Sequence, residues 1–358
     1  MKHLSALFLL AGFLVASTVA SQAADLELSE TIQLPTSHSI GWVRTNTQPR
    51  NQKTWDWQLD DAQWQRAVQQ KGEGKKEDCT FDLWVPDGIE YVKGVVVMSG
   101  HGSGQTLYRH PKLRKIASDL GLAMFKFIGN PMQRGFWPKS LLCDRLKAFG
   151  QKSQHPELQH APLFLYGHSN GTGFSAIFPA TEGARVWAWV SMRPGTTAQV
   201  HQPGAAHVPG MIMFGEDDPF FARPSQQENM AVVETMRKDH GALWHFVVEP
   251  GTGHGPGKKS WPLVFSFLRH SWAARVPADC DPRKGPVTLL TLQQKQGHLG
   301  RNWDVEEGGY QTLPTAPFTS FTEEKTVASW LINAAYAAHW QQFQRDGQLG
   351  NRGEADNK

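Results

Sequence analysis

Residues 161–171 read Ala-Pro-Leu-Phe-Leu-Tyr-Gly-His-Ser-Asn-Gly, an apolar run that ends in a serine between two glycines. The run predicts a buried strand over 162–166, and residues 172–178 can form a helix after it. A G-x-S-x-G pattern between a strand and a helix is typical of a sharp, strained turn, because its glycines leave room for the tight backbone. The alternative is a serine in an ordinary strand-to-helix turn. The rest of the chain must supply chemical partners for Ser169 if the turn is more than structural.

Segments with strand and helix patterns alternate on both sides of this turn. Short apolar runs with a period of two or without interruption predict strands, and longer amphipathic stretches predict helices. Such alternation is typical of an α/β fold with a mostly parallel central sheet and helices on both faces. The expected strands are 79–86, 94–98, 122–128, 162–166, 186–192, 207–214 and 244–249, and the expected helices are 111–120, 140–148, 172–178, 226–240 and 261–272.

The composition is that of an ordinary globular chain: of 358 residues, 40% are hydrophobic and 19% are charged, with a formal net charge of +3. Its 36 basic and 33 acidic residues form no long basic block, so the sequence gives no support for binding nucleic acid. The 15 histidines include no H-E-x-x-H motif, and the three cysteines lack the spacing of metal ligands. We therefore expect neither a metal nor an organic cofactor.

The first residues have the three-part pattern of a secretory signal peptide. Lys2 precedes an apolar stretch, 4–19, and the small residues Ser21 and Ala23 stand where a signal peptidase would require them. The stretch is shorter than a bilayer-spanning helix needs, which argues against a retained membrane anchor. The sequence therefore predicts that residues 1–23 are a signal peptide and that the mature protein is periplasmic or secreted.

Export implies an oxidising compartment, and this bears on the three cysteines. Two of Cys79, Cys143 and Cys280 can form one disulfide there, which leaves one thiol over. The sequence does not select the pair.

The chain after the signal peptide divides into two parts by pattern. Residues 24–277 contain the alternating elements and form the expected catalytic domain, with an irregular N-terminal lead-in over 26–41. Residues 278–358 form a C-terminal extension with a strand candidate and one long amphipathic helix, which we expect to pack on the domain. The strand candidate is 287–292, the helix is 323–343, and a polar tail begins at about 344.

A serine becomes a useful nucleophile only when a base removes its proton, and the base usually needs a carboxylate to orient it. In hydrolases built around a G-x-S-x-G turn, the carboxylate follows a later strand and the histidine follows the next one. Here Glu216-Asp217-Asp218-Pro219 follows the strand that ends at Phe214, and Gly253-His254-Gly255 follows the strand 244–249. Both segments lie where the carboxyl ends of strands place ligand sites in open α/β sheets.

With these motifs, residues 79–272 resemble the α/β-hydrolase superfamily, and within it the secreted esterase and dienelactone-hydrolase-like groups. The resemblance implies that Ser169 is the nucleophile, His254 the general base and Asp218 the orienting carboxylate. Asp217 is the competing candidate; Asp218 is favoured because it lies three residues after Gly215 and directly before a proline, as in the superfamily.

The resemblance also implies donors for a negatively charged oxygen and residues on the substrate side. One donor is expected to be the backbone N–H of Asn170, and the second to come from the turn 99–104, with Ser103 favoured by its position. His101 in the same turn is a candidate substrate-binding residue. Further candidates come from the loop after strand 122–128, because such loops collect binding residues; they are Gln133, Arg134, Phe136 and Trp137.

These residues predict an exported serine hydrolase that cleaves carboxylic esters, of small molecules or derived from polymers, through an acyl-enzyme intermediate. One alternative is an exported serine peptidase on the same fold, although no propeller-like repeats precede the catalytic domain. The other is a binding protein that keeps the fold without catalysis, for which the C-terminal extension is the only indication. The sequence leaves the acyl group, the alcohol and the oligomeric state open.

Overall fold

The computed structural model describes residues 24–35, 61–69, 76–129, 139–194, 202–220, 223–256 and 259–349. The expected signal peptide and the candidates Gln133, Arg134, Phe136 and Trp137 lie outside these ranges.

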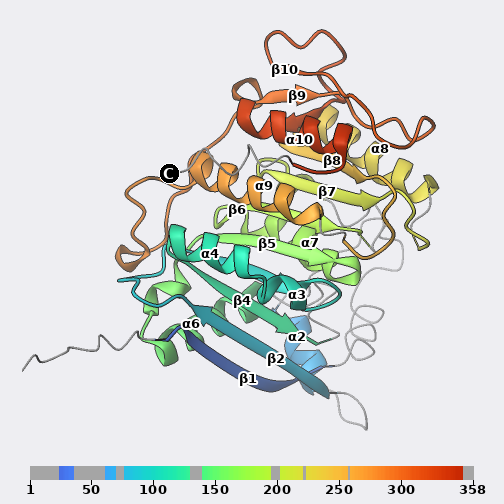
Figure 1. Ribbon diagram of the computed structural model, residues 1–358. Coiled ribbons are helices and arrows are strands. Elements are labelled where there is room, and N and C mark those ends of the chain that lie inside the picture. Colours follow the sequence, from blue (N-terminus) through green and yellow to red (C-terminus); the bar gives the residue numbers. More distant parts are fainter. Residues whose placement is uncertain are drawn as a thin grey trace, which may run out of the picture.

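Among the described residues, one large sheet of eight strands has the order β1-β2-β4-β3-β5-β6-β7-β8 (Figure 1). The strands β3 to β8 pair in parallel, whereas β1 pairs antiparallel with β2, and β2 pairs antiparallel with β4. The bounds are β1 (Leu26–Pro35), β2 (Lys76–Val85), β3 (Gly94–Ser99), β4 (Leu122–Ile128), β5 (Leu163–His168), β6 (Val186–Met192), β7 (Gly210–Gly215) and β8 (Trp244–Glu249). The predicted α/β class with a mostly parallel sheet is confirmed.

Helices cover both faces of this sheet, which explains why its parallel strands are apolar along their whole length. In Figure 1, α4 (Pro111–Leu120) and α9 (Ser260–Arg275) lie in front of the sheet, and α6 (Lys139–Ser153) and α7 (Thr172–Glu182) lie behind it. Every residue of β3, β5, β6, β7 and β8 is buried between these layers. The other α-helices in the described part of the chain are α2 (Asp61–Gln69), α3 (Gly104–Tyr108), α8 (Arg223–His240) and α10 (Ala334–Asp346).

The N-terminal lead-in differs from the expectation. Instead of an irregular segment over 26–41, residues Leu26–Pro35 form β1, which is paired with β2 along its full length. Its side chains alternate between exposed and half-buried, as the sequence LELSETIQLP allows. The polar residues that suggested a loop are the solvent face of an edge strand.

The C-terminal extension also differs. Residues 287–292 form no strand, and the helix expected over 323–343 begins only at Ala334, where the Asn333 side chain accepts a hydrogen bond from the backbone N–H of Tyr336. Before this cap, Trp330 and its neighbours form β11 (Ser329–Leu331), in a small antiparallel sheet with β9 (His298–Gly300) and β10 (Thr315–Pro317). Pairing with β9 therefore overrides the helical spacing of these apolar residues.

The extension covers the free edge of β8, the last strand of the large sheet. The backbone N–H of Phe246 donates to Ser329 Oγ at 3.0 Å, and the indole N–H of Trp340 donates to the Phe246 carbonyl at 3.1 Å. The Gln344 side chain accepts from the backbone N–H of Val248 at 3.3 Å and donates to its carbonyl at 2.5 Å. Side chains thus take the place of a ninth strand and satisfy an otherwise open edge.

Gln344→Leu is expected to lower the free energy of unfolding by about 2–4 kcal/mol, because it leaves a buried N–H and a buried C=O of Val248 without partners. Urea unfolding followed by circular dichroism measures this change. Gln348→Leu, at an exposed position just after α10, is the control and should shift stability by no more than about 0.5 kcal/mol. Equal unfolding midpoints for the two variants would contradict the role of Gln344.

The expected disulfide is absent: all three cysteines, which the structure describes, are free thiols. Each has a separate environment, since Cys143 Sγ accepts from the Arg185 guanidinium at 3.5 Å and Cys280 Sγ lies 3.5 Å from the Lys93 carbonyl. Burial raises the pKa of Cys79 to about 12 and that of Cys280 to about 11, so both thiols are protonated at neutral pH. None of the described helices is both long enough and apolar enough to cross a bilayer.

Candidate active site

Ser169 lies in a strained turn between β5 and α7. Its φ angle is +56°, in the left-handed region that side chains with a Cβ atom disfavour. The turn is so tight that a Cβ atom on Gly167 would overlap the carbonyl of Gly171, and one on Gly171 would overlap the Ser99 side chain. Both glycines of the sequence pattern are therefore required by close packing, and the strain marks Ser169 as a functional candidate.

Asp218 and His254 meet at the carboxyl ends of β7 and β8. The Oδ2 atom of Asp218 lies 2.8 Å from Nδ1 of His254, and its Oδ1 atom accepts the backbone N–H of Phe220 at 2.9 Å. Asp218 is buried, whereas Asp217 is exposed. Because Nδ1 faces a carboxylate, it carries the proton, and Nε2 of His254 is left as the basic nitrogen.

His168, the residue before Ser169, connects the serine turn to both neighbouring loops. Its Nε2 lies 2.9 Å from the His254 carbonyl, and its Nδ1 lies 2.8 Å from the backbone nitrogen of Ser103. A carbonyl can only accept and an amide N–H can only donate, so His168 is the neutral tautomer with its proton on Nε2. Burial lowers the pKa of His168 to about 4, which keeps it neutral.

The two imidazoles, His168 and His254, also pack against each other with ring centroids 5.1 Å apart. Ser169 is therefore covalently next to a residue that contacts the His254 backbone and ring. Sequence reasoning missed His168, although it occupies the variable position inside the G-x-S-x-G pattern. Its role depends on partners 65 and 86 residues away along the chain.

The expected oxyanion donors have different environments. Asn170 stands in the first turn of a 3-10 helix, Ser169–Gly171, that leads into α7, where backbone N–H groups have no partner within the helix. The backbone N–H of Ser103 points instead to His168, and its hydroxyl lies 2.7 Å from the buried Tyr166 hydroxyl. Only the hydroxyl of Ser103 is left for a further role. The substrate candidate His101 is half-buried in the turn before α3.

A further residue that the sequence did not single out is Phe220. Its side chain is 70% exposed, and its ring contacts the His254 ring edge-on with centroids 4.9 Å apart. Phe220 gives His254 an apolar neighbour that solvent can reach. Within the described ranges, no group of three or more His, Cys, Asp or Glu residues is arranged to hold a metal ion.

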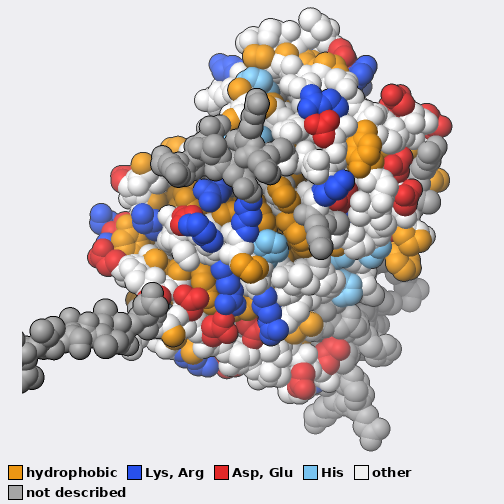
Figure 2. All heavy atoms as spheres, in the orientation of Figure 1, with side chains coloured by type: hydrophobic (Ala, Val, Ile, Leu, Met, Phe, Trp, Pro, Cys, Tyr) orange, Lys and Arg blue, Asp and Glu red, His pale blue; other side chains and the backbone are white. Residues whose placement is uncertain are grey.

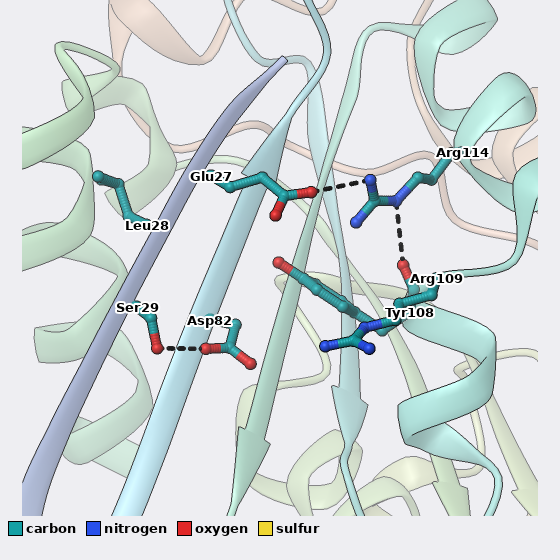
Figure 3. Close-up of a pocket in the computed structure, with 7 residues that line it drawn as sticks. All are labelled: Glu27, Leu28, Ser29, Asp82, Tyr108, Arg109 and Arg114. Carbon is teal, nitrogen blue, oxygen red and sulfur yellow. Dashed lines mark hydrogen bonds and ion pairs between the residues drawn. The ribbon is translucent and has the colours of Figure 1, made fainter. Parts of the chain in front are cut away.

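A separate cavity of about 510 Å³ lies beside β1, β2 and the α3–α4 region, and none of the three residues Ser169, Asp218 and His254 lines it (Figure 3). Among its lining side chains, Glu27 pairs with Arg114 at 2.8 Å, and Asp82 pairs at 2.6 Å with Lys126, which does not itself line the cavity. Figure 2 shows basic and acidic side chains intermixed on this face of the molecule. This cavity is therefore distinct from the candidate active site.

No protein-family model and no curated protein matches the chain. Solved structures with a similar fold include a thermostable esterase (12% identity, 56% of this chain and 59% of that chain, TM-score 0.37) and a ferulic acid esterase (12%, 69% and 96%, 0.41). Another is an S-formylglutathione hydrolase from Agrobacterium tumefaciens (15%, 56% and 92%, 0.41). The chain thus spans about 59% of the length of the thermostable esterase.

At such identities the likeness concerns the fold alone. The structure itself has two features of a hydrolase sheet: its strand order, and the strained serine turn between a strand and a helix at the carboxyl end of β5. On these two features, the chain has the α/β-hydrolase fold.

Proposed function

We propose that the protein is a serine hydrolase that cleaves carboxylic esters through an acyl-enzyme intermediate. The observation that carries the proposal is the buried Asp218 carboxylate, 2.8 Å from His254, in loops that His168 ties to the strained turn of Ser169. This is the set of groups that activates a serine: a nucleophile, a base whose Nε2 is unprotonated, and a carboxylate that orients the base.

In the first half of the reaction, Ser169 Oγ attacks the ester carbonyl while Nε2 of His254 accepts the hydroxyl proton. The Asp218 carboxylate stabilises the imidazolium that forms, and the Asn170 N–H donates to the negatively charged oxygen, with the Ser103 hydroxyl as the candidate second donor. The tetrahedral intermediate collapses, the alkoxide takes the proton from His254 and leaves as an alcohol, and the acyl group stays on Ser169. Water activated by His254 then attacks this ester, and the acid departs as Ser169 regains its proton.

We also propose that the protein is exported. The basic, apolar and small-residue order of residues 1–23 supports this. Mass spectrometry of the protein from its native cells should find a mature chain that begins at Ala24; a chain retaining Met1 would contradict export by this route.

A fluorophosphonate probe is expected to label the purified protein, and short p-nitrophenyl esters should be hydrolysed. Ser169→Ala should abolish labelling and reduce kcat by roughly 10⁵- to 10⁶-fold. Ser175→Ala is the matched control, because Ser175 is a buried serine in α7, six residues after Ser169, and it should label like the unmodified protein.

Two outcomes would overturn the proposal. If the unmodified, folded protein is not labelled, Ser169 is not an activated nucleophile. If it is labelled but hydrolyses peptide anilides and no esters, the protein is a serine peptidase instead.

A further inference from the structure

Arg193 is a buried arginine in an unusual backbone conformation beside the candidate active site. It follows β6 directly, has no exposed surface, and has a φ angle of +48°. A side chain as large as arginine rarely adopts this region, so its contacts must impose the conformation.

One set of contacts fixes Arg193 itself across several elements. Its backbone N–H donates to the Met213 carbonyl on β7 at 2.6 Å, and its guanidinium pairs with the Glu249 carboxylate at the end of β8, at 2.5 Å. The same Glu249 oxygen accepts from the Ser260 hydroxyl at the start of α9. Burial lowers the pKa of Arg193, and the neighbouring Glu249 opposes this effect. Arg193 thus joins the ends of three strands and a helix.

The remaining contact reaches the loop that carries His254. Nε of Arg193 donates to the Gly253 carbonyl at 3.3 Å, one residue before His254. The same loop is also bonded to the loop of Asp218, since the backbone N–H of Asp217 donates to the Thr252 carbonyl at 3.0 Å. Gly215 makes this approach possible, because any side chain there would collide with the Thr252 and Gly253 carbonyls. The loops of Asp218 and His254 therefore meet at Arg193.

We propose that Arg193 is a positioning residue: through Gly253 it sets the His254 imidazole against the Asp218 carboxylate. The residue is fully buried, so it acts on the loop and does not touch substrate. Its guanidinium is suited to this because one rigid fork donates to Glu249 and Gly253 in different directions. The expected effect on kcat rests on the proposed function, whereas the placement of the His254 imidazole against Asp218 does not.

Arg193→Lys keeps the charge near Glu249 but loses the fixed donor to Gly253. In p-nitrophenyl acetate hydrolysis we expect kcat to fall by about 10- to 100-fold with KM changed less than about twofold. Arg237→Lys is the matched control, since Arg237 is equally buried but holds the carbonyls of Ala242, Lys325 and Ala328, away from the site. It should lower thermal stability to a similar extent and leave kcat unchanged.

A spectroscopic measurement separates this inference from the proposed function. The proton between His254 Nδ1 and Asp218 should give a downfield proton NMR signal, assigned by its loss in His254→Gln. The signal should broaden or vanish in Arg193→Lys and persist in Arg237→Lys, whether or not the protein hydrolyses esters.

If Arg193→Lys fails to fold, the double variant Arg193→Gln/Glu249→Gln removes both charges together and should show the same loss of signal and of kcat. An unchanged signal and kcat in a folded Arg193 variant would overturn the positioning role, as would equal losses in Arg237→Lys.

Discussion

Asp218→Asn is expected to lower kcat for ester hydrolysis by about 10⁴-fold while KM changes little. The carboxylate accepts a hydrogen bond from Nδ1 of His254 at 2.8 Å, which keeps the ring proton on Nδ1 and leaves Nε2 as the nitrogen that accepts the serine proton. An asparagine amide can instead donate to Nδ1, which moves the ring proton to Nε2 and removes the base. Steady-state kinetics with p-nitrophenyl acetate measures the effect.

Asp217→Asn is the control for this experiment. It makes the same change of charge one residue away, on a side chain that is exposed, so kcat should stay within about twofold of the unmodified value. Urea unfolding of both variants shows whether a loss of activity reflects a loss of folded protein. If Asp217→Asn loses as much rate as Asp218→Asn, or more, the assignment of the carboxylate is wrong.

Much of the central sheet could be predicted from the sequence, because its strands are buried on both faces and therefore read as continuous apolar runs. The strands 122–128, 186–192 and 244–249 have the predicted bounds, and so does the helix 111–120. The resemblance to the α/β-hydrolase superfamily pointed to Asp218 and His254 as partners, and the parallel pairing of β7 with β8 brings the ends of these strands side by side.

The residues that sequence reasoning missed act through contacts between distant parts of the chain. Arg193 and Glu249 are 56 residues apart, and the side chain of Gln344 replaces a strand partner for Val248, 96 residues away. No local pattern reports such contacts. At 323–333 local spacing was misleading, because Trp330 has helical spacing but pairs in a strand with β9. The edge strand β1 was missed although Leu26, Leu28, Ile32 and Leu34 alternate with polar residues. Its partner β2 lies about 50 residues further along the chain, and this pairing is not visible in the local sequence.

The free energy of unfolding is expected to fall steeply as the pH drops below about 6.5. Burial lowers the pKa of His168 to about 4, that of His245 to about 3 and that of His270 to about 4, from an ordinary value of 6.5. In the unfolded chain these histidines take up protons near pH 6.5, while in the folded protein they stay neutral. Their contribution to stability is therefore complete above pH 6.5 and is lost as the pH falls toward 4, by about 1.4 kcal/mol per pH unit for each histidine.

Three such groups together give a slope of up to about 4 kcal/mol per pH unit, which a protein of ordinary stability, about 5–15 kcal/mol, cannot sustain far below pH 5. Urea unfolding at about pH 7.5, 6.5 and 5.5 measures the slope directly. His245→Gln should reduce the slope by up to about 1.4 kcal/mol per pH unit, the share of one proton. His240→Gln, at the exposed end of α8, is the control and should leave it unchanged.

The window between about pH 6.5 and 5 separates the histidines from the carboxylates whose pKa the fold lowers. Hydrogen bonds from Arg283 lower the pKa of Asp281 to about 2, and that of Glu157, which accepts from His155 and Val92, lies below its ordinary 4.5 despite burial. Their contribution to stability is present above pH 4.5 and is lost only as the pH falls through lower values. A flat dependence of stability on pH within the window would therefore mean that His168, His245 and His270 are not held neutral by the fold. It would also remove the basis for the fixed tautomer through which His168 ties the turn of Ser103 to the loop of His254.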